Sequence, residues 1–347
     1  MDTNGPTQAI IALSPIKQAI ARIYHNLTKK HGINLVRQTL RYLVASKHGL
    51  PSSAIVDLLS CDELVLAGDD VFKWWNPPVR RLPDLLWKRL REDLGAYLSD
   101  RGGYDGLVLH QLYHRQFWET AELLFLSTDR EREATAQHLS QFFNGDFSSP
   151  SLVSFEESVT ISNGPQQGER MTITKAEDRL ITPQPLSFEG GKLFNKLKLA
   201  ELPFEQVNSN QFEQLCTSLF NFEFIESKLA ARMKSQLMED YLYAIDACHY
   251  HQPASKATEQ CAKNLSQFHR FLKRLQHIFE TDPRAVLQFA LNEPPPSIVS
   301  IEAHLQRNRN SVYFGKVNQQ HNASRHNTPQ HTTTRHNAPQ YESNSTI

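Results

Sequence analysis

Apolar residues recur at helical spacing near the start of the chain. A stripe with steps of three or four positions is formed by Ile16, Ile20, Ile23 and Leu27. Residues spaced in this way fall on one face of a helix. Gly32 follows, and a glycine just past the last turn is a frequent helix end. The pattern predicts an amphipathic helix over residues 16–31.

Similar spacing continues to residue 143 and predicts further helices. They cover residues 34–43, 54–59, 82–98, 113–126 and 131–143. We expect Asn34 to cap the first of these helices, and Pro51 to begin the next, because these residue types favour helix starts. A short run at 106–110 has the pattern of a strand. We interpret residues 16–145 as one N-terminal helical domain.

A second helical block spans residues 191–305. Its longest stripe recurs every four residues and consists of Ile225, Leu229, Met233, Leu237, Tyr241 and Ile245. This stripe predicts one long helix packed on its neighbours. We expect Pro203 to break the helix before it, because proline lacks the amide proton of a helix interior. Leu265 to Phe279 repeats the helical pattern.

Two segments lack this periodicity. Residues 146–190 are rich in Ser, Thr, Pro, Gln and Gly, with a strand pattern only around Val159 and Ile173, so we expect a flexible linker or insertion. Residues 306–347 contain a near-repeat, Arg325-His-Asn-Thr-Pro-Gln330 and Arg335-His-Asn-Ala-Pro-Gln340. This tail offers too little apolar surface to offset its ordering entropy, and we expect it to be disordered.

Composition narrows the classes of function. The 347 residues carry 37 basic and 37 acidic side chains, so no net charge attracts nucleic acid or an anionic membrane. No apolar run is long enough to span a bilayer, and Met1 to Pro15 lacks the pattern of a secretory signal. We therefore expect a cytoplasmic protein with reduced thiols.

The cysteines do not form a convincing metal site. They are Cys61, Cys216, Cys248 and Cys261. Zinc sites usually contain paired ligands two to four residues apart. Only Cys248-His249-Tyr250-His251 comes close, and a buried cysteine beside exposed histidines accounts for it. We expect no metal.

Motifs for common enzyme chemistry are absent from the sequence. Gly191-Lys192 and Gly315-Lys316 lack the first glycine and the following Ser or Thr of a phosphate-binding loop. There is no Gly-x-Ser-x-Gly and no His-Glu-x-x-His. Adjacent carboxylates such as Glu92 and Asp93 point in different directions on a helix and suit a solvated face. We expect no catalysis and no bound nucleotide from this chain alone.

Two features leave alternatives open. The basic residues Arg80, Arg81, Lys88, Arg89 and Arg91 crowd one helix after two others, as in a helix-turn-helix reader of nucleic acid. Acidic neighbours dilute that charge, so we do not favour nucleic acid as the partner. Trp74-Trp75 precedes Asn-Pro-Pro78; this aromatic pair either packs inside or marks an interaction surface.

Taken in order, a set of short segments resembles one family. These segments are Leu35-Val36 with Leu43, Gly49-Leu-Pro-Ser-Ser-Ala-Ile-Val-Asp-Leu-Leu-Ser60, Arg81-Leu-Pro-Asp-Leu-Leu-Trp87, Asp93-Leu94, Tyr113-His-Arg-Gln-Phe117, His138-Leu-Ser-Gln-Phe-Phe-Asn-Gly145, Glu201-Leu-Pro-Phe204, Phe224-Ile-Glu-Ser-Lys228 and Gln288-Phe-Ala-Leu-Asn292. Their order and spacing over residues 16–305 resemble the region after the nucleotide-binding core in NACHT and WD-repeat proteins, a branch of the STAND signalling ATPases.

The resemblance implies a mostly α fold, with a winged-helix domain over about residues 34–126 followed by a helical-bundle domain. In STAND proteins these parts fold back on the ATPase and restrain it until nucleotide exchange. A winged-helix histidine contacts the ADP phosphate in related members, and His114 matches it by position, with His110 as the second choice. A histidine that caps or packs at a helix start is the structural alternative. By this resemblance a nucleotide-binding core would precede residue 16 and a propeller would follow residue 305.

These observations lead to one main functional hypothesis. We expect a non-catalytic regulatory or scaffold module that binds protein partners, including a NACHT-type NTPase domain, and meets ADP or ATP only through that domain. Arg115 and Trp118 beside His114 are interaction candidates, together with Trp74 and Trp75. The alternatives are a winged-helix nucleic-acid binder, or a truncated remnant with no independent function.

Overall fold

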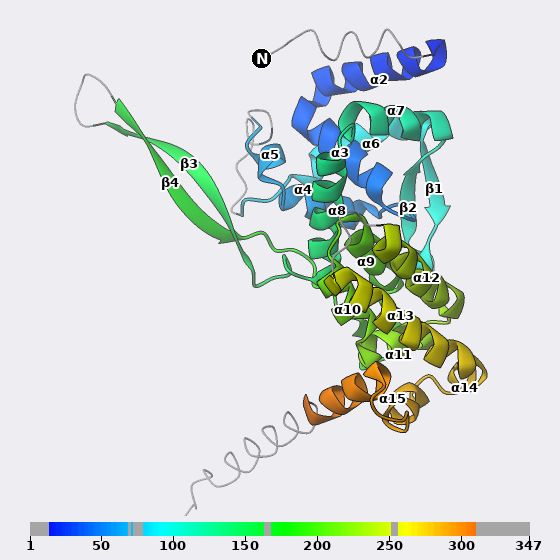
Figure 1. Ribbon diagram of the computed structural model, residues 1–347. Coiled ribbons are helices and arrows are strands. Elements are labelled where there is room, and N and C mark those ends of the chain that lie inside the picture. Colours follow the sequence, from blue (N-terminus) through cyan, green and yellow to red (C-terminus); the bar gives the residue numbers. More distant parts are fainter. Residues whose placement is uncertain (1–13, 69–70, 72–78, 163–167, 251–255, 310–347) are drawn as a thin grey trace, which may run out of the picture.

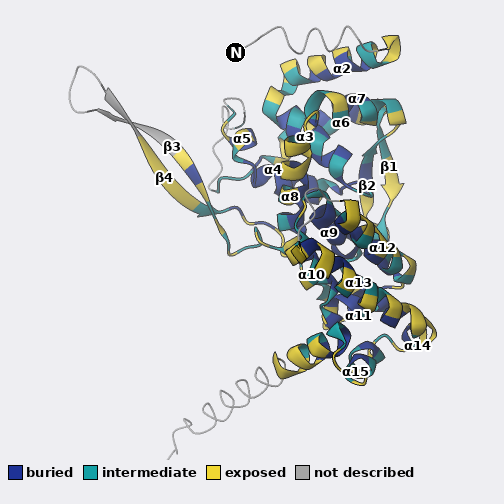
Figure 2. Ribbon diagram, viewed as in Figure 1, coloured by how far each residue is buried: buried dark blue, intermediate teal, exposed yellow. Residues whose placement is uncertain are grey.

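Two helical parts lie end to end, and a long β-hairpin projects from one side (Figure 1). This computed structural model describes residues 14–68, 71, 79–162, 168–250 and 256–309. Buried hydrophobic residues from both parts form one continuous core, and exposed residues lie along the outer helix faces (Figure 2). The expected mostly α architecture, a winged-helix domain followed by a helical domain, is confirmed.

The first part has the element order of a winged helix with added helices. Its elements are α2 (Pro15–His31), α3 (Ile33–Ala45), α4 (Ser52–Ser60), α5 (Glu63–Leu66), α6 (Asp84–Leu94), η1 (Gly95–Tyr97), β1 (Leu98–Gly102), η2 (Tyr104–Gly106), β2 (Val108–Leu112), α7 (Arg115–Phe125) and α8 (Asp129–Asn144). Helices α3, α4 and α6 form the three-helix centre. Strands β1 and β2 form the wing.

A backbone bridge at Leu50 helps to fasten the wing to the helices. β1 and β2 pair antiparallel, with Leu98 opposite Leu112. Leu50 adds an antiparallel bridge to His110, through two backbone hydrogen bonds of 2.9 and 3.2 Å. Gly49, just before it, has φ +86°, and a side chain there would meet the His110 carbonyl at 2.5 Å. The sequence therefore needs glycine where the chain leaves α3 to reach the wing.

The segment expected as a flexible linker or insertion, 146–190, contains a regular β-hairpin, and its two strands include Val159 and Ile173, where the sequence pattern placed strands. β3 (Leu152–Ser162) and β4 (Gly168–Asp178) pair antiparallel, with Val159 opposite Met171. At the base of this hairpin Arg179 is fully buried; it pairs with Glu63 and donates to the Arg80 carbonyl at 2.8 Å. The buried arginine ties the hairpin to the winged-helix part. The polar composition of the segment did not predict this contact, because an arginine is usually exposed, whereas Arg179 is paired inside the protein.

The second part is a helical bundle. It contains β5 (Ser187–Phe188), β6 (Leu193–Phe194), α9 (Lys196–Asn208), α10 (Phe212–Leu219), α11 (Phe222–Ala230), α12 (Lys234–Tyr250), α13 (Lys256–Arg274), α14 (Gln276–Thr281) and α15 (Ala285–Leu291). A further helix covers residues 298–309. Helix α9 packs against α8 of the first part and against α10, α11 and α12 of the second.

Several predicted helix limits were wrong. Residues 225–245 form two helices, because Arg232 turns the chain with φ +61° between α11 and α12. Pro203 lies inside α9 and does not break it. Asn34 is not a cap: α3 begins at Ile33, and the Asn34 side chain donates to the Leu64 carbonyl at 2.8 Å. The 82–98 helix ends at Leu94, and the 265–279 stripe is shared between α13 and α14.

The remaining differences concern the cysteines and the chain end. Cys216 and Cys261 form a disulfide, whereas we expected reduced thiols. We expected the disordered tail to begin at residue 306. Residues 306–309 are instead helical, and Gln306 accepts a hydrogen bond of 2.9 Å from the Phe222 amide. Residues 310–347 lie outside the described part of the chain. So do Trp74 and Trp75, whose expected role as an interaction surface stays a prediction.

Candidate functional site: a buried polar junction and the His114 surface

Helix α9 passes through a proline without a break because another group replaces the missing hydrogen bond. In a helix the amide of residue 203 would donate to the carbonyl of Leu199, four residues earlier. Pro203 has no amide proton. The ammonium of Lys228 on α11 donates to this carbonyl instead, at 2.5 Å. A side chain far along the sequence therefore completes α9.

Lys228 is itself fully buried, which makes its charge costly unless it is paired. Its partner is the carboxylate of Asp240 on α12, which is also buried. Burial lowers the pKa of Lys228, whereas Asp240 raises it again by attraction. The pair therefore connects α9, α11 and α12 through one ammonium group.

Another buried carboxylate, that of Glu201 on α9, joins the two parts of the molecule. The two oxygens of Glu201 accept hydrogen bonds from the backbone amides of Lys47 and His48, at 2.8 and 2.9 Å. Both amides lie in the turn after α3, just before Gly49. We call Glu201, Lys47 and His48 the interdomain clamp, because it fixes the helical part to the connection between α3 and the wing.

Further contacts surround the interdomain clamp. The ammonium of Lys47 lies 3.6 Å from Asp240 and 5.7 Å from the centre of the Phe204 ring. Tyr104, in the wing, accepts a hydrogen bond of 3.1 Å from the Gln236 amide on α12. The turn after α3 and the wing therefore both bind the helical part. We call the connected group of Lys47, His48, Glu201, Lys228 and Asp240 the junction.

Burial sets the protonation of the junction. It raises the pKa of Glu201 to about 7, against the opposing effect of the two amides that donate to it. Glu205, one turn further along α9, is also fully buried, and neither of its oxygens has a hydrogen-bond partner among the described residues. Desolvation and the neighbouring Glu201 raise the pKa of Glu205 well above its usual value. Burial therefore favours the neutral form of Glu205.

The nucleotide-contact candidate His114 lies at the N-terminus of α7 and is exposed. Its Nδ1 accepts a hydrogen bond of 3.2 Å from the Gln116 amide, so the ring caps the helix. In the neutral ring this capping leaves the proton on Nε2, which can donate to an external acceptor. Anions are also stabilised at a helix N-terminus by the helix dipole. Capping and an outward-facing donor are thus combined in one side chain.

Two of the interaction candidates, Arg115 and Trp118, lie on the same helix, α7. The Arg115 side chain is 86% exposed and pairs with Glu119 at 2.6 Å. Trp118 is 38% exposed and donates from Nε1 to the Val44 carbonyl at 3.1 Å, so its ring is held in a fixed position. Tyr113, just before the helix, is 69% exposed. We call these four residues, Tyr113, His114, Arg115 and Trp118, the His114 surface.

The second-choice histidine lies in the core. His110 is 2% exposed, and its ring atoms contact the Asp100 carboxylate at 2.7 Å and the Ser52 hydroxyl at 2.8 Å. The Trp87 ring also packs against it, 5.8 Å between centroids. The imidazole fixes the wing to α4 and α6, and a phosphate outside the chain does not reach it.

The basic residues around α6 are mostly paired. Arg80 contacts Glu63, Arg81 contacts Asp57, and Arg91 contacts Asp100, at 3.1, 2.5 and 3.0 Å. On the exposed face, Lys88 and Arg89 are balanced by Asp84 and Glu92. This helix would enter the DNA groove in a winged-helix reader. Its balanced face does not supply the excess positive charge that phosphate binding needs.

Sequence comparison places both parts among known domains. Residues 12–131 match the family "NWD1-like, winged helix-turn-helix domain", and residues 201–310 match the family "APAF-1 helical domain". The interdomain clamp connects the two matches. The chain resembles the winged-helix and helical-domain region of NACHT and WD-repeat proteins. This agrees with the resemblance in the short sequence segments.

Two curated relatives support this assignment. NACHT domain- and WD repeat-containing protein 1 of Homo sapiens is 34% identical over 238 residues, which cover 68% of this chain and 14% of the relative. The Mus musculus protein of that name is 34% identical over 202 residues, 57% of this chain and 12% of the relative. The chain thus spans only about a seventh of these relatives. No solved structure matches it.

The described residues contain no group of three or more His, Cys, Asp or Glu placed to hold a metal ion. In the sequence grouping that came nearest to a zinc site, Cys248 is buried and His251 lies outside the described residues, while Cys261 further along is in the disulfide. No described helix is both long and apolar enough to cross a bilayer.

The replacement of a backbone donor by Lys228 gives a first prediction. We expect Lys228→Met to lower the free energy of unfolding by about 3–5 kcal/mol, because Asp240 loses its buried partner. Pro203→Ala supplies an amide to the Leu199 carbonyl, so it should recover about 1 kcal/mol in this background. Urea unfolding of the single and double variants measures both effects.

Lys88→Met, on the exposed face of α6, is the matched control and should change stability little. If Pro203→Ala changed the free energy of unfolding equally in the presence and absence of Lys228, the ammonium would not replace the missing amide at the Leu199 carbonyl.

The raised pKa of Glu201 gives a second prediction. Between about pH 4.5 and 7 this carboxyl is protonated in the folded chain and ionised in the unfolded chain. The folded state then binds more protons, so the Glu201 contribution to stability is full below pH 4.5 and is lost as the pH rises through 7. The loss should be on the order of 3 kcal/mol.

Denaturant unfolding at a series of pH values should show a smaller decline across this window in Glu201→Gln. The exposed control Glu92→Gln should keep the decline of the parent chain. An unchanged slope in Glu201→Gln would show that this carboxyl ionises normally in the fold.

Proposed function

We propose that the chain is a non-catalytic regulatory module that docks on a nucleotide-binding partner of NACHT type and restrains its switching. The observation that carries this proposal is the interdomain clamp. A buried carboxylate accepts hydrogen bonds from two amides of the turn after α3 and so connects the winged-helix part to the helical part. In this proposal the two parts move as one body. A rigid body of this kind can pass a displacement at one end to the other.

The His114 surface is the docking site in this proposal. Exposed aromatic and arginine side chains are enriched in binding hot spots, and here they surround a helix N-terminus. The Nε2 proton of His114 would donate to a phosphate oxygen of ADP held by the partner. Restraint then follows if the module binds the ADP state more tightly than the ATP state, because only differential affinity shifts an equilibrium.

Binding of the full chain to an isolated NACHT-type nucleotide-binding domain tests this proposal. We expect tighter binding to the ADP-loaded domain than to the domain with a non-hydrolysable ATP analogue. His114→Ala, Arg115→Ala and Trp118→Ala should each weaken binding about tenfold, as loss of a hot-spot contact does. Isothermal titration calorimetry gives the dissociation constants.

Arg89→Ala, on the exposed face of α6, is the control and should leave this affinity unchanged. Unfolding midpoints of all variants separate docking from folding, since Trp118→Ala also removes the bond to Val44. Equal affinity for both nucleotide states would refute the restraint. Salt-sensitive binding to duplex DNA that Arg89→Ala abolishes would favour the nucleic-acid alternative instead.

A further inference from the structure

The disulfide joins two helices of the second part at an accessible position. Cys216 lies on α10 and Cys261 on α13, 45 residues apart in sequence. Cys261 is 8% exposed, whereas Cys216 is half-buried. Neither residue belongs to the junction or to the His114 surface. The bond therefore concerns a different part of the molecule.

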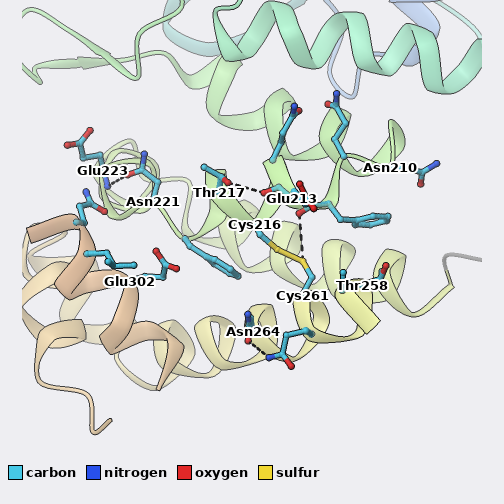
Figure 3. Close-up of a pocket in the computed structure, with 18 of the residues that line it drawn as sticks. Asn210, Glu213, Cys216, Thr217, Asn221, Glu223, Thr258, Cys261, Asn264 and Glu302 are labelled. Atoms are coloured by element: carbon cyan, nitrogen blue, oxygen red, sulfur yellow. Dashed lines mark hydrogen bonds between the residues drawn. A yellow bond between two sulfur atoms is a disulfide. The ribbon is translucent and has the colours of Figure 1, made fainter. Parts of the chain in front are cut away.

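A cavity of about 1020 Å³ opens onto this bond. Its walls come from α10, α13 and the helix over 298–309, and Figure 3 shows the two sulfur atoms among the lining side chains. Cavities of this size commonly hold small molecules. A reagent that enters it reaches Cys216 without unfolding of either helix.

The cavity also has an uneven charge. Three carboxylates, Glu213, Glu223 and Glu302, line it together with one arginine, Arg309. Within the described part of the chain, none of the three carboxylates is in an ion pair. Negative charge at a reaction site repels anionic reagents and attracts cationic ones.

We propose that Cys216 and Cys261 form a reversible thiol–disulfide exchange site, served through this cavity by neutral or cationic low-molecular-weight thiols. The thiolate of the small molecule attacks Sγ of Cys216, the more exposed of the two residues. A mixed disulfide forms at Cys216, and the Cys261 thiolate leaves and takes a proton from water. A second thiol attacks the mixed disulfide and releases Cys216 as a thiol. Two small thiols are oxidised to one disulfide, and the protein bond is reduced.

The exchange loosens the second part without unfolding it. The Phe220 and Phe268 rings stack 4.5 Å apart and keep α10 packed against α13 when the bond is open. Reduction removes a covalent closure of a 45-residue loop, which mainly restricts the unfolded chain. The reduced protein should therefore remain folded and melt at a lower temperature.

The other two cysteines are internal controls. Cys61 and Cys248 are buried free thiols, and burial raises the pKa of Cys61 to about 12 and that of Cys248 to about 11. Thiols with such pKa values are not thiolates at neutral pH and react slowly. If alkylation after reduction is confined to Cys216 and Cys261, the protein was therefore still folded when the disulfide was reduced.

The test measures reduction of the folded full chain by three thiols of different charge: cysteamine, 2-mercaptoethanol and mercaptoethanesulfonate. Alkylation and mass spectrometry follow Cys216 and Cys261, with rates expressed per thiolate. We expect the cationic thiol to react at least several-fold faster than the anionic one at low salt, and the difference to shrink at high salt. Glu213→Gln with Glu302→Gln should shrink it as well. The unfolding midpoint should fall by roughly 5 °C or more on reduction.

A trapping variant locates the attacked sulfur. Cys261→Ser should accumulate a mixed disulfide at Cys216 on treatment with cystamine, and Cys216→Ser should accumulate much less at Cys261. The proposal is overturned if the bond reduces only in denaturant, if Cys61 and Cys248 react at the same rate, or if the anionic thiol is as fast as the cationic one.

Discussion

One buried ammonium group determines how the second part of this molecule is built. Lys228 donates to the carbonyl that Pro203 leaves without a partner in α9, and it pairs with Asp240 on α12. A proline inside a helix and a lysine inside a core are each unfavourable alone. Together they satisfy each other, since the ammonium replaces the missing amide. The positions of α9, α11 and α12 follow from this one arrangement.

The interdomain clamp depends on that arrangement, because Glu201 lies on α9 between Leu199 and Pro203. If α9 kinked at the proline, its carboxylate would not meet the amides of Lys47 and His48. The junction thus extends from a local helix defect to the relation between the two parts. The proposed regulation by docking needs such a connection, because two parts joined by a flexible hinge cannot transmit a displacement from one to the other.

The sequence predicts the helices well and the junction poorly, for physical reasons. Apolar stripes such as Ile16 to Leu27 depend on local spacing, which survives in the folded chain. The sequence predicts a helix break at Pro203 because proline lacks an amide proton. The donor that replaces this proton, Lys228, lies 25 positions later, and no local pattern reveals it. Glu201 and Glu205 have the residue type of a solvated face. The placement of His114 at a helix start was predictable, whereas its tautomer and exposure needed the structure.

Native-state hydrogen exchange of the Lys47 and His48 amides tests the central claim most directly. If Glu201 holds the two parts as one body, both amides should exchange only when the chain unfolds globally. Their free energy of opening should then equal that of the amides in the middle of α3 and α9. Exchange of Lys47 and His48 at a clearly lower free energy, while α3 and α9 stay protected, would show a hinge at this position and contradict the account.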